Sequence, residues 1–408
     1  MTILQNGPHG RRRDDDPAPD GTGVDYIARA RELAPVVAAQ ADEIERRREL
    51  PESLRERLIE AGFFRLLLPR SLGGAELPPL PFVEVIEEIA KADASTAWCL
   101  NQVSGCSMTA AYLAPEAARA VFGAPDGILA WGPGPGEARV VDGGYRVTAR
   151  FSFASGSHDA SWLGAHLPVV ECDGKPRLHA DGSSVVHTFL FPKSAAQMTD
   201  IWHVVGLKGT GSDQYSVEDL FVPARFWVAR DDPGARREHG LLYDFSALQL
   251  YASGFAAVAM GIARATLDAF VELARDKIPR GAKRTLRDNN VIQAQVSQSE
   301  ARLGCARAFL LSSLDEIWRE VSGSGRLTMD HNTTIRLAST WAIHQARDVV
   351  DAAYHAAGAT AIFESNPFER RFRDIHTVVQ QYQGRQAHFE AVGQALLGLE
   401  PEGAMFTF

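Results

Sequence analysis

Apolar residues recur every three or four positions over two long parts of the chain, which is the spacing of one buried helix face. In the first part four helical runs are expected, over 26–49, 51–61, 82–89 and 98–113. In the second part the runs are longer, over 248–277, 290–321, 332–357 and 376–397. Helices of this length pack antiparallel, so the chain is expected to end in a four-helix bundle.

Between the two helical parts, short runs rich in β-branched and aromatic residues replace the helical spacing. Turn sequences such as Asp142-Gly143-Gly144 separate them. Seven strands are expected, at 128–131, 140–141, 145–153, 162–172, 184–191, 202–205 and 215–222. Strands without helices between them are typical of an antiparallel β-barrel or sandwich. The predicted fold class is α+β, with a helical domain over 24–125, an antiparallel β-barrel over 126–235 and the bundle over 236–408.

Composition narrows the class of protein. The 408 residues are 45% hydrophobic and 23% charged, which is ordinary for a soluble globular protein. A net charge of −9 argues against a nucleic-acid or membrane-surface binder, and no apolar run reaches the roughly 18 residues of a membrane span. The four cysteines form no metal-binding pair and are expected as reduced thiols of a cytoplasmic protein. Residues 1–23 show no signal-peptide pattern and are expected as a disordered tail.

Two stretches of the predicted β region carry candidate chemistry. Arg150–Gly156 is either a strand end with a small-residue turn or a place where Ser155 and backbone N–H groups face a ligand, since Gly156 leaves room. Trp202–Ser212 carries three glycines but matches neither the phosphate loop nor G-x-G-x-x-G, so a Rossmann domain is not supported. This second stretch is either a β-turn with a bulge or a cofactor-facing loop.

A third stretch lies near the end of the chain. Its first part, Phe368–His376, has alternating charges and is typical of a solvated salt-bridge cluster where a helix begins. Glutamines follow at 380, 381, 383 and 386, and buried amides would need polar partners in a pocket. No H-E-x-x-H motif or ligand cluster predicts a metal site, and no G-x-S-x-G motif predicts a serine hydrolase.

Taken in order, the three stretches resemble the acyl-CoA dehydrogenase superfamily. The resemblance rests on Phe-Ala-Ser-Gly at 153–156, W-x-x-x-G-L-K-G-T-G-S at 202–212 and Arg-Asp-Ile-His at 373–376, and it covers 26–400. The sequence is most similar to the two-component flavin-dependent monooxygenases, or group D hydroxylases. The similarity implies reduced flavin, FMN or FAD, supplied by a separate reductase. It also implies O₂, a hydroperoxide at the flavin C4a kept from water, and oxygenation of a small or medium apolar substrate, aromatic ones included.

The resemblance further implies a homotetramer with the flavin between the β region and the C-terminal helices. Ser155 would hydrogen-bond the flavin near N5, and Trp131 and Trp202 would line its ring. Basic residues of a neighbouring subunit would hold the phosphate, and the segment 275–287 lies where they would come from, although it is also simply a loop joining two helices. The cofactor-binding residues expected on this basis are Trp131, Phe153, Ala154, Ser155, Trp202, Arg275 and Arg280.

Two positions depart from the family pattern. Where the dehydrogenases have a glutamate base, nine residues after Arg373, this chain has Tyr382, and the alternative position for that base falls near Ala247. Because abstraction of an α-proton requires a base, acyl-CoA dehydrogenation is disfavoured. Where the monooxygenases commonly have histidine, this chain has Gln381, which can hydrogen-bond but cannot exchange a proton near neutral pH.

The sequence therefore predicts a flavin-dependent monooxygenase. Two alternatives stay open: an acyl-CoA dehydrogenase-like flavin oxidoreductase and a catalytically silent scaffold of the same fold. The candidate catalytic residues are Ser155, Gln381 and His376.

Overall fold

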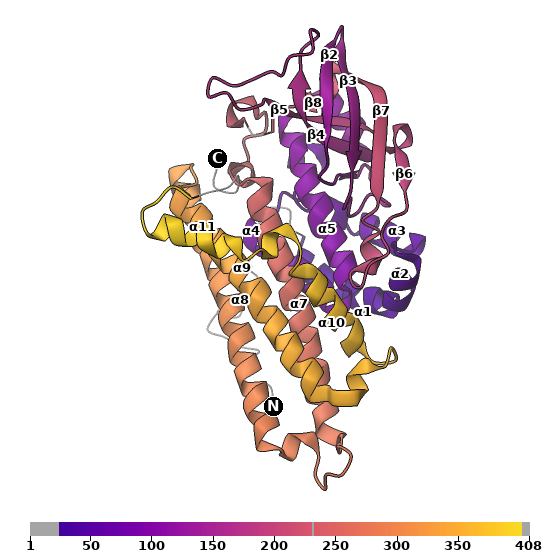
Figure 1. Ribbon diagram of the computed structural model, residues 1–408, viewed down its shortest axis with the longest axis vertical. Helices are drawn as coiled ribbons and strands as arrows, with labels where there is room; N and C mark the ends of the chain where they lie inside the picture. The colour runs from indigo at the N-terminus through magenta and orange to yellow at the C-terminus, as the bar shows by residue number, and fades with distance from the viewer. Residues whose placement is uncertain (1–23, 231, 402–408) are drawn as a thin grey trace.

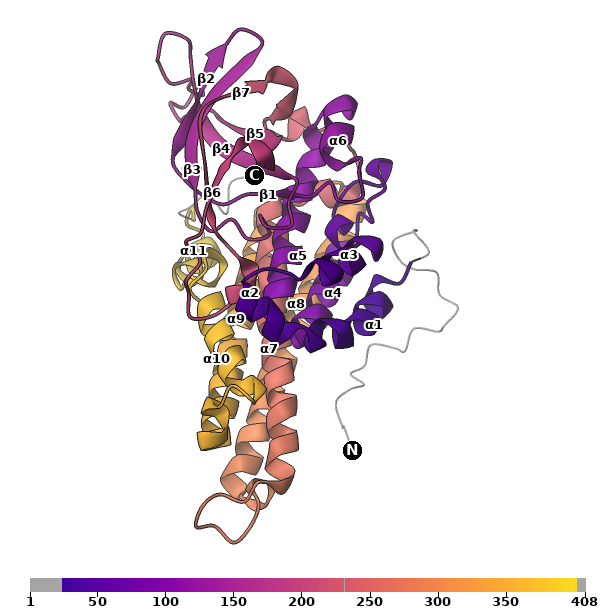
Figure 2. The same cartoon turned by 90° about the vertical axis from the view of Figure 1, so that its right-hand side faces the viewer.

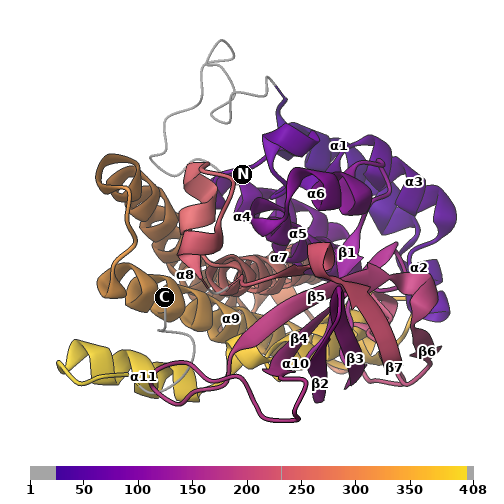
Figure 3. The same ribbon diagram turned by 90° about the horizontal axis from the view of Figure 1, so that it is seen from above.

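The computed structural model describes residues 24–230 and 232–401, so the expected tail over 1–23 lies outside the described residues. A β-sheet lies at one end of the molecule and three long helices extend from it to the other end (Figure 1). Seen from above, the N-terminal helices lie on one side of helix α7 and helices α9 to α11 on the other (Figure 3). This arrangement makes α7 the central helix of the molecule.

The N-terminal region is helical, as predicted. Its helices are α1 (Tyr26–Ala39), α2 (Ala41–Arg47), α3 (Glu52–Glu60), α4 (Pro79–Ala92), α5 (Ala94–Ser107) and α6 (Pro115–Phe122). The single helix expected over 26–49 is wrong, because the chain breaks at Gln40 and α2 turns to pack against residues 208–210. Helix α5 begins where the Asp93 carboxylate accepts the Thr96 N–H at 2.7 Å. It is buried along nearly its whole length, between α4, α7 and strand β1.

The sheet is open and mixed, so the prediction of an antiparallel β-barrel is wrong. Its strands are β1 (Leu129–Ala130), β2 (Gly136–Val141), β3 (Gly144–Phe151), β4 (Trp162–Val170), β5 (Val186–Pro192), β6 (Gln197–Thr199), β7 (Gln214–Pro223) and β8 (Trp227–Val228). They follow the order β6-β7-β3-β2-β4-β5-β8, and β1 and β2 each pair with β4 in parallel. The two end strands span three and two residues, which is too short an edge to close a barrel.

The strand predicted at 202–205 is also wrong, and the cause is local. The N–H groups of Ile201 and Trp202 donate to the Asp213 carboxylate at 2.9 and 3.0 Å instead of to a neighbouring strand. A side chain that binds backbone N–H groups in this way competes directly with the sheet. Residues 201–213 therefore form an irregular loop between β6 and β7.

The C-terminal region is helical, with α7 (Ala247–Asp276), α8 (Asn290–Ser324), α9 (Met329–Ala357), α10 (Pro367–Val378) and α11 (Ala387–Leu396). The fourth long helix predicted over 376–397 is wrong, because α10 ends at Val378 and α11 starts at Ala387. The Gln381 side chain accepts the N–H of Gln383 at 2.6 Å and so holds a turn between them. Three long helices and two short ones thus replace the four long helices that we expected.

Helix α7 is long and apolar enough to cross a membrane, by length and composition alone. It packs against α4, α5, α9 and α10, and most of its apolar stretch is buried. Burial of this kind is typical of the central helix of a globular protein.

Candidate functional site

Ser155 lies in the turn that follows β3, against helix α5. Gly156 has φ of +76°, and a Cβ atom there would come within 2.6 Å of Val103 on α5, so only glycine allows this close approach. The Trp98 indole N–H, also on α5, donates to Ser155 Oγ at 3.0 Å. The Ser155 side chain is buried between the sheet and the helix.

A chain of three hydroxyl groups begins at Ser155. Its Oγ lies 2.6 Å from Ser212 Oγ, which lies 2.7 Å from Thr210 Oγ1. Thr210 donates its own proton to the Leu207 carbonyl at 2.9 Å. Because Thr210 can then only accept, the fully bonded chain runs from Ser155 through Ser212 to Thr210. If Ser212 instead donates to Ser155, it gives up its bond to Thr210 and the Ser155 proton is free to donate to a ligand. Donation from Trp98 into Ser155 Oγ strengthens that donor.

The loop 201–213 supplies two of these hydroxyl groups and is held in place from within. Asp213 binds the loop's first N–H groups, and its second oxygen lies 2.8 Å from His158 Nε2. Leu207 and Gly211 have φ of +52° and +48°, so the chain is left-handed on both sides of Lys208–Thr210. Glycine favours this conformation, which explains part of the glycine content of the stretch.

Helix α10 anchors the same loop from outside. The Asp374 carboxylate accepts the Leu207 N–H at 2.6 Å, and the Arg373 guanidinium donates to the Val205 carbonyl at 2.7 Å. A Cβ atom at Gly206 would meet the Arg373 carbonyl at 2.2 Å, so the loop and the helix touch through their backbones. Burial raises the pKa of Asp374 to about 7. The structure thus joins the second and third stretches that the sequence singled out.

An apolar surface lies beside the hydroxyl chain. Phe153 has φ of +56° and is 63% exposed, and its ring meets the Trp202 ring edge-on at 5.9 Å. Val205, in the same loop, is 69% exposed. Phe153 and Val205 together offer an apolar surface that a ligand could cover. The residues present fit a flavin, because its flat ring needs an apolar surface and its polar edge needs a hydrogen-bond donor such as Ser155.

Trp131 lies just after β1 and beside the first stretch, since a Cβ atom at Gly132 would meet the backbone of residues 152 and 154. Its indole is buried, and its carbonyl accepts from Gln102 Nε2 at 3.4 Å. Gln102 lies one helical turn after Trp98 on α5. The structure therefore brings Trp131 and Ser155 to the same face of α5.

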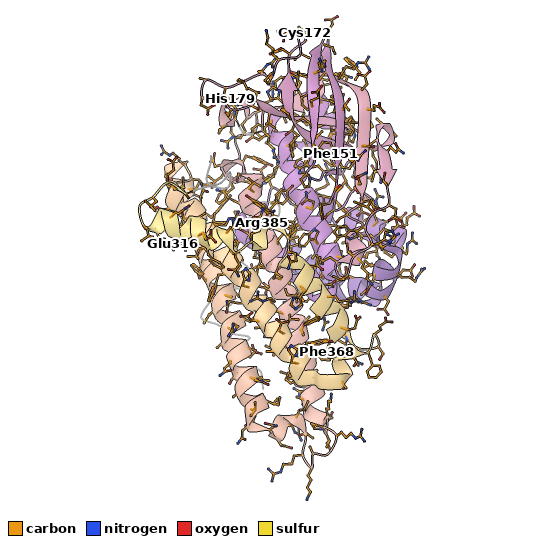
Figure 4. The ribbon with its side chains drawn as sticks, viewed as in Figure 1. Phe151, Cys172, His179, Glu316, Phe368 and Arg385 are labelled. Atoms are coloured by element: carbon orange, nitrogen blue, oxygen red, sulfur yellow. The ribbon has the colours of Figure 1, made fainter. Side chains whose placement is uncertain are left out.

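The other two candidate catalytic residues, His376 and Gln381, are each held by a contact of their own. His376 Nε2 lies 2.9 Å from Asp351 of α9, on the face of α10 turned about 200° from Asp374. The Gln381 amide oxygen is engaged by its own turn, as described above. Figure 4 shows that the segment around Arg385, after α10, lies nearer the sheet than Phe368 at the start of that helix.

Arg275 and Arg280 lie far from Ser155. Both belong to the end of α7 and the loop that joins it to α8, and this loop lies at the opposite end of the molecule from the sheet (Figures 1 and 2). Arg280 is exposed, whereas Arg275 pairs with Glu272. Within one chain these two residues cannot share a site with Ser155.

Sequence reasoning missed Trp98, Thr210 and Ser212 as site residues. Trp98 lies 57 positions before Ser155, and nothing in the sequence signals that contact. The two hydroxyl residues lie inside the glycine-rich stretch that was already singled out, so their polarity was a usable signal. Among residues 24–230 and 232–401, no group of three or more His, Cys, Asp or Glu could hold a metal ion.

Comparison with known proteins identifies the family. Residues 27–122 match the acyl-CoA dehydrogenase N-terminal domain, and residues 253–386 match the acyl-CoA dehydrogenase C-terminal domain. The chain is 29% identical over 368 residues to an indole-3-acetate monooxygenase of Pseudomonas putida, covering 89% of this chain and 91% of that protein. It is 28% identical to the flavin-dependent monooxygenase oxygenase subunit HsaA of Rhodococcus jostii (strain RHA1), covering 84% and 90%.

Solved structures agree with these matches. The 3-HSA hydroxylase from Rhodococcus sp. RHA1 superimposes with a TM-score of 0.84 at 26% identity, over 94% of this chain and 99% of that one. XiaF from Streptomyces sp., solved with FADH2 and glycerol, has a TM-score of 0.84 at 25% identity, over 93% and 96%.

The fold and the site define a member of the acyl-CoA dehydrogenase family, and the chain belongs to that family. Within it, the relatives are named as monooxygenases and hydroxylases, and HsaA as a flavin-dependent one, which confirms the expected class of enzyme. The protein is an oxidoreductase of this kind.

Proposed function

We propose that the protein is the oxygenase component of a two-component system, which receives reduced flavin from a separate reductase and uses O₂ to hydroxylate a small aromatic substrate. Relatives named indole-3-acetate monooxygenase, resorcinol hydroxylase and p-hydroxyphenylacetate 3-hydroxylase, the last two as oxygenase components, support this choice of substrate class. The observation that carries the proposal is the Ser155 hydroxyl, held by Trp98 and Ser212 beside the exposed Phe153.

The bound flavin supplies the activation of O₂, and the chain's own residues bind and shield it. Ser155 donates its hydroxyl proton to the polar edge of the ring, while Phe153 and Trp202 cover an apolar part of it. Trp98 packs on Phe255 of α7 in a tilted arrangement with ring centroids 4.0 Å apart, so the side that faces α7 is apolar. Exclusion of water is what a reactive oxygenating site requires.

The structure offers no base for α-proton abstraction at the two positions that dehydrogenases use. Tyr382 is partly exposed with its backbone in a turn, and Ala247 begins α7. Neither side chain can accept a proton near neutral pH. The chain is therefore expected to bind a flavin without dehydrogenating an acyl thioester.

A second copy of the chain completes the flavin site in this proposal. The loop between α7 and α8 exposes four cations that form no ion pair among the described residues: Arg280, Lys283, Arg284 and Arg287. Clustered basic side chains suit a phosphate group. Since this loop lies far from the Ser155 of its own chain, it would meet the flavin phosphates of a neighbouring copy in a homotetramer (Figure 2). We place this assembly in the cytoplasm.

FAD is the flavin that we propose over FMN. The resorcinol hydroxylase is named as FADH(2)-dependent, and XiaF was solved with FADH2. The two phosphates of FAD also give the four cations of the loop more charge to bind than the single phosphate of FMN does.

The test is titration of the full-length protein with reduced FAD and reduced FMN under nitrogen, followed by admission of O₂. We expect tighter binding of reduced FAD, and O₂ consumption coupled to a hydroxylated product when an aromatic substrate such as indole-3-acetate or resorcinol is present. The proposal fails if neither flavin binds in either redox state. Anaerobic bleaching of bound oxidised flavin by an acyl-CoA would instead support the dehydrogenase alternative.

A further inference from the structure

His158 lies three residues after Ser155 in the same turn, and its ring bridges two carboxylates from different parts of the chain. Its Nδ1 lies 3.0 Å from Glu49 Oε2, just after α2 ends, and its Nε2 lies 2.8 Å from Asp213 Oδ2. Asp213 is the residue that holds the loop 201–213 from within. The ring therefore joins the segment after α2 to that loop.

Both contacts are hydrogen bonds only when the His158 ring carries two protons. A neutral imidazole has one donor and one acceptor nitrogen, whereas an ionised carboxylate can only accept. The Arg47 guanidinium, which donates to Glu49 at 2.6 Å, holds the pKa of that carboxyl below its ordinary value. The Asp213 carboxylate accepts two backbone N–H groups on its other oxygen, an arrangement that suits an ionised acceptor. The structure thus fits a protonated His158 that donates to both sides.

Charges of both signs surround the His158 ring. Besides the two bridged carboxylates, the charged or titratable groups that lie around it are Asp159, Asp200, Arg47, Arg48, Arg55, Lys193 and His203. The four Arg and Lys side chains donate to Glu49, to Asp200 and to the backbone carbonyls of residues 158 and 159. Both ring nitrogens are thus left to the two bridged carboxylates.

The bridge lies next to the hydroxyl groups of the site. Ser212, the residue before Asp213, has its Oγ 2.6 Å from Ser155 Oγ. A Cβ atom at Gly211 would come within 2.9 Å of His158 Cδ2, so the ring also packs on the backbone of the loop. Movement of Asp213 would therefore displace the hydroxyl group that sets the direction of the Ser155 proton.

We propose that protonated His158 is a positioning residue for the flavin reaction. By linking Glu49 to Asp213, its ring keeps the neighbouring Ser212 hydroxyl in place. Raising the pH removes one ring proton, and the bare nitrogen then faces a carboxylate that repels it. Whichever nitrogen loses the proton, the link from Glu49 to Asp213 is broken. The effect on flavin rests on the proposed function, whereas the order of the loop is a property of the flavin-free chain.

Asp213→Asn separates this role from a merely structural one. The amide oxygen can still accept the N–H groups of Ile201 and Trp202, and the amide N–H can donate to a ring nitrogen that carries no proton. Neutral His158 then satisfies both contacts, because it donates to Glu49 and accepts from the amide. The variant should therefore hold the loop at high pH, where the wild-type link is broken.

The first measurement is amide hydrogen exchange of the flavin-free, full-length protein at pH 6 and pH 9, read by mass spectrometry of peptides that span 201–213. Exchange rates are divided by those of unstructured peptides at the same pH, because exchange itself depends on pH. In wild type we expect protection to fall by about tenfold from pH 6 to pH 9, which corresponds to one charge-assisted hydrogen bond. In Asp213→Asn protection should stay within about twofold. Asp159 and Asp374, whose pKa values burial raises to about 6 and about 7, titrate in both proteins and drop out of the comparison.

Two further variants test the histidine itself. His158→Gln cannot donate to both carboxylates with a charged ring, so it should show low protection at both pH values, like wild type at pH 9. His203→Gln is the matched control, because His203 lies in the same loop near one carboxylate, that of Asp200, and its side chain is 70% exposed. This control should keep the wild-type response to pH. Thermal midpoints report whether each variant is folded.

Reduced FAD is then titrated into wild type and Asp213→Asn under nitrogen at both pH values. From pH 6 to pH 9 we expect the affinity of wild type to fall by about threefold to tenfold more than that of Asp213→Asn. Ionisation of the flavin itself affects both proteins alike and cancels in this ratio.

The inference is overturned if wild type and Asp213→Asn lose loop protection equally, if His158→Gln keeps wild-type protection at pH 6, or if His203→Gln abolishes the response. It is also overturned if loop protection follows pH while reduced-flavin affinity does not. Failure of the proposed function has a different signature, because neither protein would then bind reduced flavin at either pH. Loop protection that still depended on His158 would in that case confirm the link and remove only its role toward flavin.

Discussion

Ser155 is the hydroxyl group whose surroundings are most tightly defined in the site. It accepts from the Trp98 indole and lies within hydrogen-bond distance of Ser212, while Gly156 presses the turn against α5. These contacts leave one proton whose direction depends on Ser212. A ligand that accepts that proton would therefore be held at a fixed point.

Replacement of Ser155 by alanine should leave the fold intact and reduce the coupling of O₂ consumption to hydroxylation. We expect the yield of hydroxylated product per O₂ consumed to fall by about tenfold or more, with the missing oxygen appearing as hydrogen peroxide, because one hydrogen bond to the flavin is lost. The measurement is the ratio of product to peroxide. Ser157→Ala is the matched control, since Ser157 is buried in the same turn but its hydroxyl has no partner among the described residues. An unchanged ratio of product to peroxide in Ser155→Ala would contradict a hydrogen bond from Ser155 to the flavin.

Gln381 is expected to act on its turn more than on the reaction. Because its amide oxygen caps the Gln383 N–H, Gln381→Ala should lower the free energy of unfolding by about 0.5–2 kcal/mol. Product yield should stay within about threefold of wild type. The measurements are denaturant unfolding and product analysis of the same preparations. A large loss of yield without a loss of stability would make Gln381 a catalytic residue after all.

Among the elements, the loop 201–213 and helix α10 act together. Asp374 and Arg373 hold the loop through Leu207 and Val205, and the loop in turn positions the hydroxyl groups of Thr210 and Ser212. In the proposed site, Asp374 would thus be a positioning residue that acts on the flavin through the loop.

Two substitutions at Asp374 should separate its hydrogen bond from its charge. Asp374→Asn keeps an acceptor for the Leu207 N–H and should bind reduced flavin within about threefold of wild type. Asp374→Ala leaves that buried N–H unpaired, at a cost of about 1–3 kcal/mol, and should weaken flavin binding by about tenfold. Anaerobic flavin titration checks both. Equal losses in the two variants would show that the negative charge, and not the hydrogen bond, holds the loop.

The same residue should make stability depend on pH. Folded Asp374 keeps its proton up to about pH 7, whereas the unfolded chain loses it near pH 4, so the group stabilises the fold at acid pH and this contribution is lost as the pH rises from about 4 through 7. In wild type this loss lowers the free energy of unfolding by on the order of a few kcal/mol, and it should be absent in Asp374→Asn. Urea unfolding at pH 5 and pH 8 measures it. If the free energy of unfolding falls by the same amount between pH 5 and pH 8 in wild type and in Asp374→Asn, the raised pKa of Asp374 is contradicted.

The helices were largely predictable from the sequence, and two of the errors share one cause. Apolar spacing is local, so it located α1, α3, α4, α5 and the three long helices. The errors at 202–205 and 376–397 arise where Asp213 and Gln381 bind backbone N–H groups that a strand or helix would otherwise use. Such competition depends on where side chains fall in space, which spacing alone does not reveal. The contact between Trp98 and Ser155 was unpredictable for the same reason.

At the scale of the whole molecule, the two halves of the proposed flavin site lie at opposite ends. Ser155 lies next to the sheet, and the exposed cations lie where α7 joins α8 (Figure 2). The sequence showed the positive segment but not its distance from Ser155, because that distance follows from the length of three helices packed side by side.

Reversing the charge of the loop between α7 and α8 should weaken flavin binding in a neighbouring chain. We expect Arg280→Glu combined with Arg284→Glu to weaken reduced-flavin binding by at least about tenfold and to leave the thermal midpoint unchanged, because both side chains are exposed. The double variant is then mixed with Ser155→Ala chains and reassembled into mixed oligomers. Part of the activity should return, because some sites then combine an intact Ser155 from one chain with an intact loop from another. Absence of recovery in verified mixed oligomers would contradict a site shared between chains.

The central claim is that the protein uses reduced flavin to insert an oxygen atom from O₂ into an aromatic substrate. The most direct measurement is one turnover of the full-length protein with reduced FAD, indole-3-acetate or resorcinol, and ¹⁸O₂, followed by mass spectrometry of the product. The account predicts a hydroxylated product that carries one ¹⁸O atom. A product labelled only from water, or reoxidation of the flavin with no product from any aromatic substrate tried, would contradict it.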